Sequence, residues 1–150
     1  MSILCATDFS PPSKLALDAA LDIAKRLGAT TFHLLHVDET IERFAAATDA
    51  EARFALEYAR LQDEARSLVT ALARECADRS GLDVTAEFRV GSAYLEIVTY
   101  ASEIHADLII VGTHGRTGLK RAIMGSVAER VVRQAPCSVL TVKTDAHAAG

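Results

Sequence analysis

The run Asp107-Leu108-Ile109-Ile110-Val111-Gly112, at residues 107–112, is almost continuously aliphatic. A strand has this pattern when helices cover both faces of its sheet, because neither face of the strand then meets water. We therefore predict a central parallel strand at 107–112. Such a strand places the chain in the α/β class.

Strands and helices alternate on either side of this central strand. Short apolar runs predict further strands at 2–6, 31–37, 83–90 and 138–143. Helically spaced apolar residues predict helices at 13–27, 51–80, 93–104 and 126–135. The residues expected to face the core are Leu17, Ala20, Leu21, Ala24 and Leu27 in the first helix, Leu61, Ala65, Leu68, Leu72 and Cys76 in the second, Leu95, Val98 and Ala101 in the third, and Val127, Val131 and Ala135 in the fourth. This alternation implies right-handed crossovers and a doubly wound parallel sheet.

The composition bounds the domain organisation and the class of function. A chain of 150 residues that is 50% hydrophobic suits one compact domain, which we place at 1–144, followed by a disordered tail at 145–150. The net charge of −4 argues against a general nucleic-acid binder. The first residues carry neither a basic region nor a long apolar run, so we expect a soluble cytoplasmic protein.

Three cysteines, Cys5, Cys76 and Cys137, show no CxxC spacing. We expect them to be reduced thiols, most of them buried. His33 and His36 are three residues apart on a predicted strand. They should therefore point to opposite faces and cannot share one metal ion.

The connection after the central strand carries the strongest signal for a ligand site. It runs Gly112-Thr113-His114-Gly115-Arg116-Thr117-Gly118-Leu119-Lys120-Arg121-Ala122-Ile123-Met124-Gly125-Ser126, and a predicted helix follows directly. Glycines allow positive φ and a close approach of free N–H groups to an anion. The positive end of the helix, the Ser126 hydroxyl and nearby basic side chains suit a phosphate group. The alternative is a plain glycine-rich connection in which Ser126 caps the helix.

In doubly wound sheets, ligands lie beyond the carboxyl ends of the strands where the strand order reverses, which directs attention to loops 7–12 and 112–125. Main-chain amides around Gly115, Gly125 and Ser126 are expected to be free and to converge on one anion. The spacing matches neither a Walker A loop nor a dinucleotide fingerprint. Asp8 follows the first strand, and its alternative role is an Asx turn or a cap for the first helix. His114 has no predictable acidic partner and can equally be an ordinary loop histidine.

The pattern Gly112-x-x-Gly115, then nine residues, then Gly125-Ser126, is similar to the ATP-binding motif of the universal stress protein (UspA-like) family. The resemblance runs from residues 3–10 through His36-Val37 and 107–112 to 135–142. It implies a five-stranded sheet of order 3-2-1-4-5, like that of the adenine-nucleotide alpha-hydrolase group, with an adenine nucleotide across strands one and four. The ligand would be ATP, AMP or ADP, together with Mg²⁺ or Mn²⁺ whose protein ligands stay unassigned.

The resemblance also assigns roles to individual residues. Asp8 would accept from ribose or base, Val37 would meet the adenine edge through its backbone, and Ala6 and Val111 would line the base pocket. Four further residues, Gly112, Gly115, Gly125 and Ser126, would hold ribose and phosphates, and Val127 would add an N–H. The full predicted contact set is Ala6, Thr7, Asp8, Val37, Val111, Gly112, His114, Gly115, Arg116, Gly125, Ser126 and Val127.

The last strand, 138–143, is expected to leave an uncovered sheet edge, which invites pairing. Members of the resembled family dimerise there, so we expect a homodimer through this strand, with no nucleic-acid or membrane partner. We predict no catalytic residue, because no hydrolase elbow, HExxH motif or cysteine–base pair is present. Two alternatives stay open: a slow ATP-hydrolysing or AMP-forming enzyme, and a partner-binding module that holds no nucleotide.

Overall fold

The computed structural model describes residues 1–40, 51–113 and 124–143. The strands are β1 (Ser2–Thr7), β2 (Thr31–Asp38), β3 (Val84–Val90), β4 (Leu108–Gly112) and β5 (Ser138–Val142). The helices are α1 (Pro11–Arg26), α3 (Glu51–Ser80), α4 (Ala93–Glu103) and α5 (Ser126–Gln134). Within the described ranges, no helix combines the length and apolar character that crossing a bilayer requires. The predicted tail, 145–150, lies outside these ranges.

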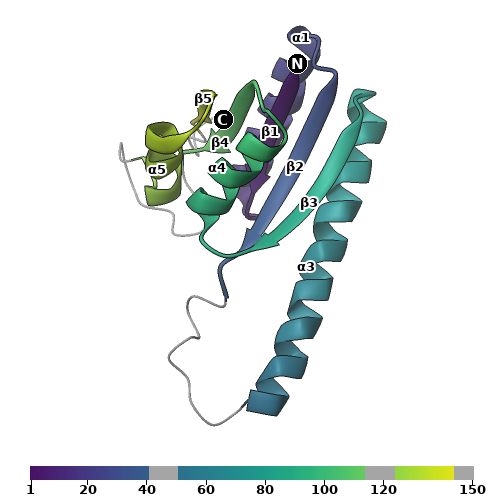
Figure 1. The fold of residues 1–150 in the computed structure, drawn as a ribbon. Coiled ribbons are helices and arrows are strands. Elements are labelled where there is room, and N and C mark those ends of the chain that lie inside the picture. The colour runs from purple at the N-terminus through teal and green to yellow at the C-terminus, as the bar shows by residue number, and fades with distance from the viewer. Residues whose placement is uncertain (41–50, 114–123, 144–150) are drawn as a thin grey trace, which may run out of the picture.

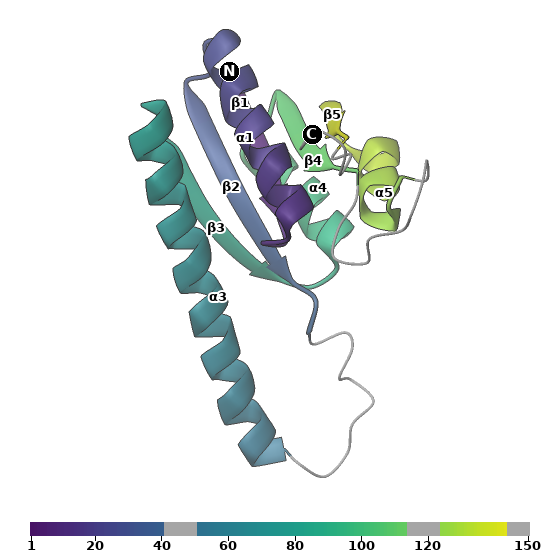
Figure 2. The ribbon, with the colours of Figure 1, turned by 180° about the vertical axis from the view of Figure 1, so that it is seen from behind.

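All five strands are parallel and lie in the order β3-β2-β1-β4-β5. Helices α1 and α3 cover one face of the sheet, and α4 and α5 cover the other (Figure 1, Figure 2). The core divides in the same way along β1, where Ile3 and Cys5 pack on the α1 side and Leu4 packs on the α4 side. Alternate residues of a strand point to opposite faces, so a strand buried on both sides must be apolar throughout. The predicted fold class and strand order are confirmed.

The turn residues set where α1 begins and ends. Ser10 is the N-cap, and its hydroxyl accepts from the Ser13 N–H at 3.3 Å. Pro11 and Pro12 occupy the first helical positions, where a missing N–H costs nothing. The helix therefore starts two residues earlier than the periodicity indicated. Gly28, at φ +64°, follows the last turn as predicted.

The predicted core face of α3 is wrong over much of its length. The buried residues are Val69, Ala73 and Cys76, whereas Leu61 and Leu68 are 49% and 56% exposed. Leu68 is exposed beside the buried Val69, so the buried face is rotated by about one residue from the predicted one. For the earlier part of the helix the reason is length: 30 residues of helix span about 45 Å, whereas the seven residues of β3 span only about 23 Å. The amino-terminal half of α3 therefore runs past the end of the sheet (Figure 1).

The other helices depart less from the predicted faces. In α1, Leu17, Ala20, Leu21 and Ala24 are buried, but Leu27 at the carboxyl end is exposed. In α4 the buried residues are Ile97, Tyr100 and Ala101, with Leu95 exposed. In α5 they are Ala128 and Val131. Each helix meets the sheet on the predicted side to within about one residue of rotation.

Candidate functional site

The carboxyl ends of the central strands meet at one edge of the sheet, because the strands are parallel. Thr7 of β1 stands opposite His36 of β2, and Cys5 of β1 stands opposite Ile110 of β4. The chain leaves β1 toward α1 on one face and reaches β4 from α4 on the other face. The β1–β4 boundary is thus the point where the winding direction reverses. The predicted residues of loops 7–12 and 112–113 lie at this edge.

The turn after β1 is held by its own side chains. The Thr7 hydroxyl accepts from the Phe9 N–H at 3.1 Å and pairs with the Ser13 hydroxyl at 3.0 Å. One carboxylate oxygen of Asp8 accepts from the Ser10 N–H at 3.0 Å and from the Ser10 hydroxyl. This is the Asx turn that the sequence left open as an alternative. It fixes the Asp8 carboxylate at the end of β1 rather than leaving it on a loose loop.

Helix α5 starts without a side-chain cap. Gly125 is the N-cap, in extended backbone at φ −60° and ψ 152°, and no described side chain caps the first turn with a hydrogen bond. Ser126 is the first helical residue and is exposed, so the alternative in which its hydroxyl caps the helix is wrong. The N–H groups of Ser126, Val127 and Ala128 precede the first intrahelical bond, which the Glu129 N–H makes to the Gly125 carbonyl at 3.0 Å. Within residues 1–40, 51–113 and 124–143, nothing accepts from these three donors, and the positive end of the helix dipole lies at the same place.

The Gly125 amide, predicted to be free for an anion, is not free. It donates to the Thr113 carbonyl at 2.8 Å, and the Thr113 N–H donates to the Val142 carbonyl at 2.9 Å. A Cβ on Gly125 would lie 3.2 Å from the Thr113 oxygen, so glycine serves a close approach here and not a positive φ. The bond joins the two ends of the glycine-rich connection. It places the first turn of α5 beside the end of β4.

Three residues predicted to meet the base, and Val127, predicted to add an N–H near the phosphates, come together in one apolar cluster. Ala6, Val37, Val111 and Val127 all pack on the α4–α5 side of the sheet. Val111 is buried, and the other three are half-buried. They come from the ends of three neighbouring strands and from the first turn of α5. Gly112 ends β4 beside them, whereas His114, Gly115 and Arg116 lie outside the described residues.

A sequence model of the Universal stress protein family matches residues 1–143. The chain belongs to the universal stress protein family. Universal stress protein MJ0531 of Methanocaldococcus jannaschii is 36% identical over 141 residues, covering 94% of this chain and 81% of that protein. The solved structure of hypothetical protein MJ0577 superposes with a TM-score of 0.83 at 33% identity, covering 97% of this chain and 96% of that one. A universal stress protein in complex with cAMP superposes with a TM-score of 0.66 at 25% identity, covering 95% and 96%.

The two strand histidines of this universal stress protein lie on opposite faces of the sheet, as predicted. The His33 Nδ1 lies 3.0 Å from the Tyr100 hydroxyl of α4, and burial lowers the pKa of His33. The His36 Nδ1 lies 2.8 Å from the Thr7 carbonyl, and its ring meets Phe9 and Phe88. In the part of the chain that the structure describes, no three His, Cys, Asp or Glu side chains gather as a metal cage.

The sequence analysis did not predict two residues that lie at this edge. Met124 packs in the same apolar cluster as Ala6 and Val37. Its apolar side chain, directly before Gly125-Ser126, was the only feature of the sequence from which this position could have been predicted. Thr113 contributes through its backbone, by accepting from Gly125, so its side chain carries no signal for that role.

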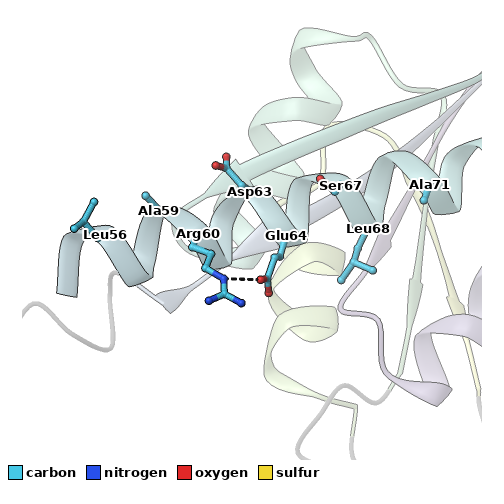
Figure 3. A pocket seen from close by; sticks show the side chains of 8 residues that line it. All are labelled: Leu56, Ala59, Arg60, Asp63, Glu64, Ser67, Leu68 and Ala71. Carbon is cyan, nitrogen blue, oxygen red and sulfur yellow. Dashed lines mark hydrogen bonds and ion pairs between the residues drawn. The ribbon is translucent and has the colours of Figure 1, made fainter. Parts of the chain in front are cut away.

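A shallow groove on α3 lies apart from these strand ends. Figure 3 shows the described side chains that line it, and all of them come from this one helix: Leu56, Ala59, Arg60, Asp63, Glu64, Ser67, Leu68 and Ala71. Arg60 and Glu64 pair across it at 3.0 Å, and both side chains are more than half exposed. Ligand sites usually bring polar groups together from several elements. The strand ends meet that description better than this helix face.

Proposed function

We propose that this universal stress protein binds ATP, or the related AMP or ADP, at the carboxyl ends of β1 and β4. It would act there as a nucleotide-dependent module of a stress response or signalling pathway. The observation that carries the proposal is the uncapped first turn of α5, tied to the end of β4 by the Gly125–Thr113 hydrogen bond. Three donors that have no partner among the described residues, together with a helix dipole at a fixed place, suit a phosphate group.

The neighbouring apolar cluster supports an adenine base as the other end of the ligand. Ala6, Val37 and Val111 offer apolar contact beside the Asp8 carboxylate, which suits a ribose hydroxyl. The likeness to a universal stress protein in complex with cAMP supports the same ligand class. The proposal also includes the other predicted nucleotide contacts, which are made by Thr7, His114, Gly115 and Arg116.

A divalent cation, Mg²⁺ or Mn²⁺, would accompany a bound nucleoside triphosphate. Mg²⁺ in nucleotide sites keeps several waters and is held chiefly by the phosphates, with one or two carboxylates from the protein. The proposal therefore requires no dedicated metal cage. We place this function in the cytoplasm, where the three free cysteines suit a reducing compartment.

We also propose a homodimer through β5. This strand ends the sheet order, and in the monomer one of its sides pairs with β4 while the other side has no strand beside it among the described residues. An edge of this kind can add a second copy antiparallel across a twofold axis.

Equilibrium titration with ATP and Mg²⁺ tests the nucleotide site. A Gly125→Val, Ser126→Ala double variant places side-chain atoms against the Thr113 carbonyl and removes the Ser126 hydroxyl. We expect ATP affinity at least about tenfold weaker, because the first turn of α5 must move away from β4. The control is Gly81→Ala, which strains a glycine at φ +71° after α3, away from the site. Equal ATP affinities in the wild type and the double variant would remove the site from consideration.

Two further measurements separate the alternatives. Native mass spectrometry of the purified protein distinguishes a nucleotide carrier from a partner-binding module that holds none. Incubation with ATP, followed by product analysis, distinguishes a binder from an enzyme. Several turnovers per minute to ADP, AMP or pyrophosphate would favour the enzyme.

A further inference from the structure

His36 is a buried polar residue at the edge that carries the proposed site. It lies near the carboxyl end of β2, directly opposite Thr7 of β1, and is 6% exposed. A buried polar group needs a hydrogen-bond partner, and the Nδ1 of His36 finds one in the Thr7 carbonyl at 2.8 Å. A carbonyl oxygen can only accept, so Nδ1 carries the proton and donates.

The His36 ring also touches the residue that turns the chain. The ring centroids of His36 and Phe9 are 4.3 Å apart, with the planes tilted by 35°. Phe9 has a φ of +61°, a left-handed conformation that is unfavourable for a bulky side chain. Such a conformation persists only where the surroundings hold it. Here the ring contact with His36 and the hydrogen bond from the Phe9 N–H to the Thr7 hydroxyl do so.

Asp8 lies between Thr7 and Phe9 in the chain, and His36 contacts both of these neighbours. Its preceding neighbour, Thr7, is tied to His36 by the hydrogen bond, and its following neighbour, Phe9, is tied by the ring contact. We propose that His36 is a positioning residue, which holds the turn 7–9 and thereby sets the Asp8 carboxylate for the nucleotide. The nucleotide part of this inference rests on the proposed function. The part that concerns the turn, in which His36 holds residues 7–9 by a hydrogen bond and a ring contact, is independent of that function.

Two substitutions separate the hydrogen bond from the ring contact. His36→Phe keeps an aromatic ring against Phe9 and removes the donor to Thr7. His36→Asn keeps an N–H donor at the position of Nδ1 and removes the ring. The matched control is His33→Phe, which changes the same residue type on the same strand but on the opposite face, where its partner is Tyr100.

The measurements are amide hydrogen exchange at Phe9 and Ser10 and ATP affinity by calorimetry, all on the full chain. The Phe9 and Ser10 amides bond within the turn, so their exchange reports its order. We expect His36→Phe to speed their exchange and to weaken ATP binding, each about tenfold, as the loss of one buried hydrogen bond allows. His36→Asn keeps the donor but loses the ring contact with Phe9, so it should recover part of both values. His33→Phe should change neither.

The outcomes distinguish this inference from the proposed function. Unchanged exchange at Phe9 and Ser10 in His36→Phe overturns the inference, whatever the ATP affinity. Faster exchange in a protein whose wild type binds no ATP supports the hold on the turn and overturns the nucleotide site. Equally fast exchange at Phe9 and Ser10 in His33→Phe would assign the effect to general packing and so also overturn the inference.

Discussion

The thiol of Cys5 is an ionisable group inside the apolar core. The residue is fully buried on β1, packed between α1 and α3, and burial raises the pKa of this thiol to about 12. The unfolded chain exposes the thiol, with a pKa near the ordinary 9.0. The protonated thiol is therefore favoured by folding. Its contribution to stability is full below pH 9 and falls as the pH rises from 9 toward 12.

We predict that the free energy of unfolding of the wild type falls more steeply above pH 9 than that of Cys5→Val. The slope that this one group adds reaches at most about 1.4 kcal/mol per pH unit. Urea unfolding at pH 7, 9 and 10 measures it, with the two proteins compared at each pH. Lysines and tyrosines titrate in both proteins, so their effect cancels in the difference between the two free energies of unfolding. Parallel curves would show that Cys5 does not stay protonated in the folded protein.

At the site, the residue types were predictable from the sequence, but the hydrogen bonds were not. The glycines and Ser126 stand out because their chemistry suits phosphate and their position follows a buried strand. The bond from Gly125 to Thr113 joins residues at the two ends of a long connection, and no local pattern encodes such a pairing. The sequence similarly offered two roles for Asp8, and only the coordinates show the Asx turn.

At the scale of elements, alternation of apolar runs and helical periods was sufficient for a doubly wound parallel sheet, whereas the strand order came from the resemblance to the universal stress protein family. Right-handed crossovers leave few other arrangements for such a chain. The face of α3 was not predictable in the same way. Leu61, Ala65, Leu68 and Leu72 form a regular apolar stripe, but the amino-terminal half of α3 lies beyond the strands (Figure 1), and both Leu61 and Leu68 are exposed. The helical period identifies the apolar stripe, but it does not predict how much of the sheet lies against that stripe to bury it.

A cluster of charges joins β3 to α4 and carries the next prediction. Arg89 of β3, with its side chain 19% exposed, meets Glu87 at 3.0 Å, Glu96 at 3.5 Å and Glu103 in a close bidentate pair. Its guanidinium lies 4.6 Å from the centre of the Tyr100 ring. The contact with Glu103 lowers the pKa of that carboxyl and raises the pKa of Arg89.

We predict that Arg89→Met lowers the free energy of unfolding by about 1–3 kcal/mol, because three carboxylates lose their shared cation at a partly buried place. Arg60→Met is the control, since Arg60 and Glu64 pair at side chains that are 71% and 55% exposed. That change should cost less than about 0.5 kcal/mol. Urea unfolding of both variants measures the difference. Equal midpoints would show that the cluster on β3 contributes no more than a surface ion pair.

At the scale of the whole molecule, the proposed dimer depends on which backbone groups of β5 face outward. Along a strand, successive residues point their N–H and C=O groups to alternate sides. The Val142 carbonyl accepts from Thr113 on the β4 side, so Leu140 and Val142 face β4. Val139 and Thr141 therefore present their backbone groups to the open edge. A second copy pairing antiparallel would use these groups.

Thr141→Pro removes one outward N–H without touching the bonds to β4, and proline is tolerated at such edge positions. We predict that this variant is monomeric with an unchanged circular dichroism spectrum, whereas Thr141→Val, which keeps the N–H, forms the dimer. Light scattering after size-exclusion chromatography gives both masses. A dimer that survives Thr141→Pro would place the interface elsewhere. Because the Val142 carbonyl also accepts from Thr113, and Thr113 accepts from Gly125, dimer formation at β5 should stabilise the position of the first turn of α5 beside β4. Loss of the dimer should therefore weaken ATP binding as well, by a few-fold, and titration of the two variants side by side tests that coupling.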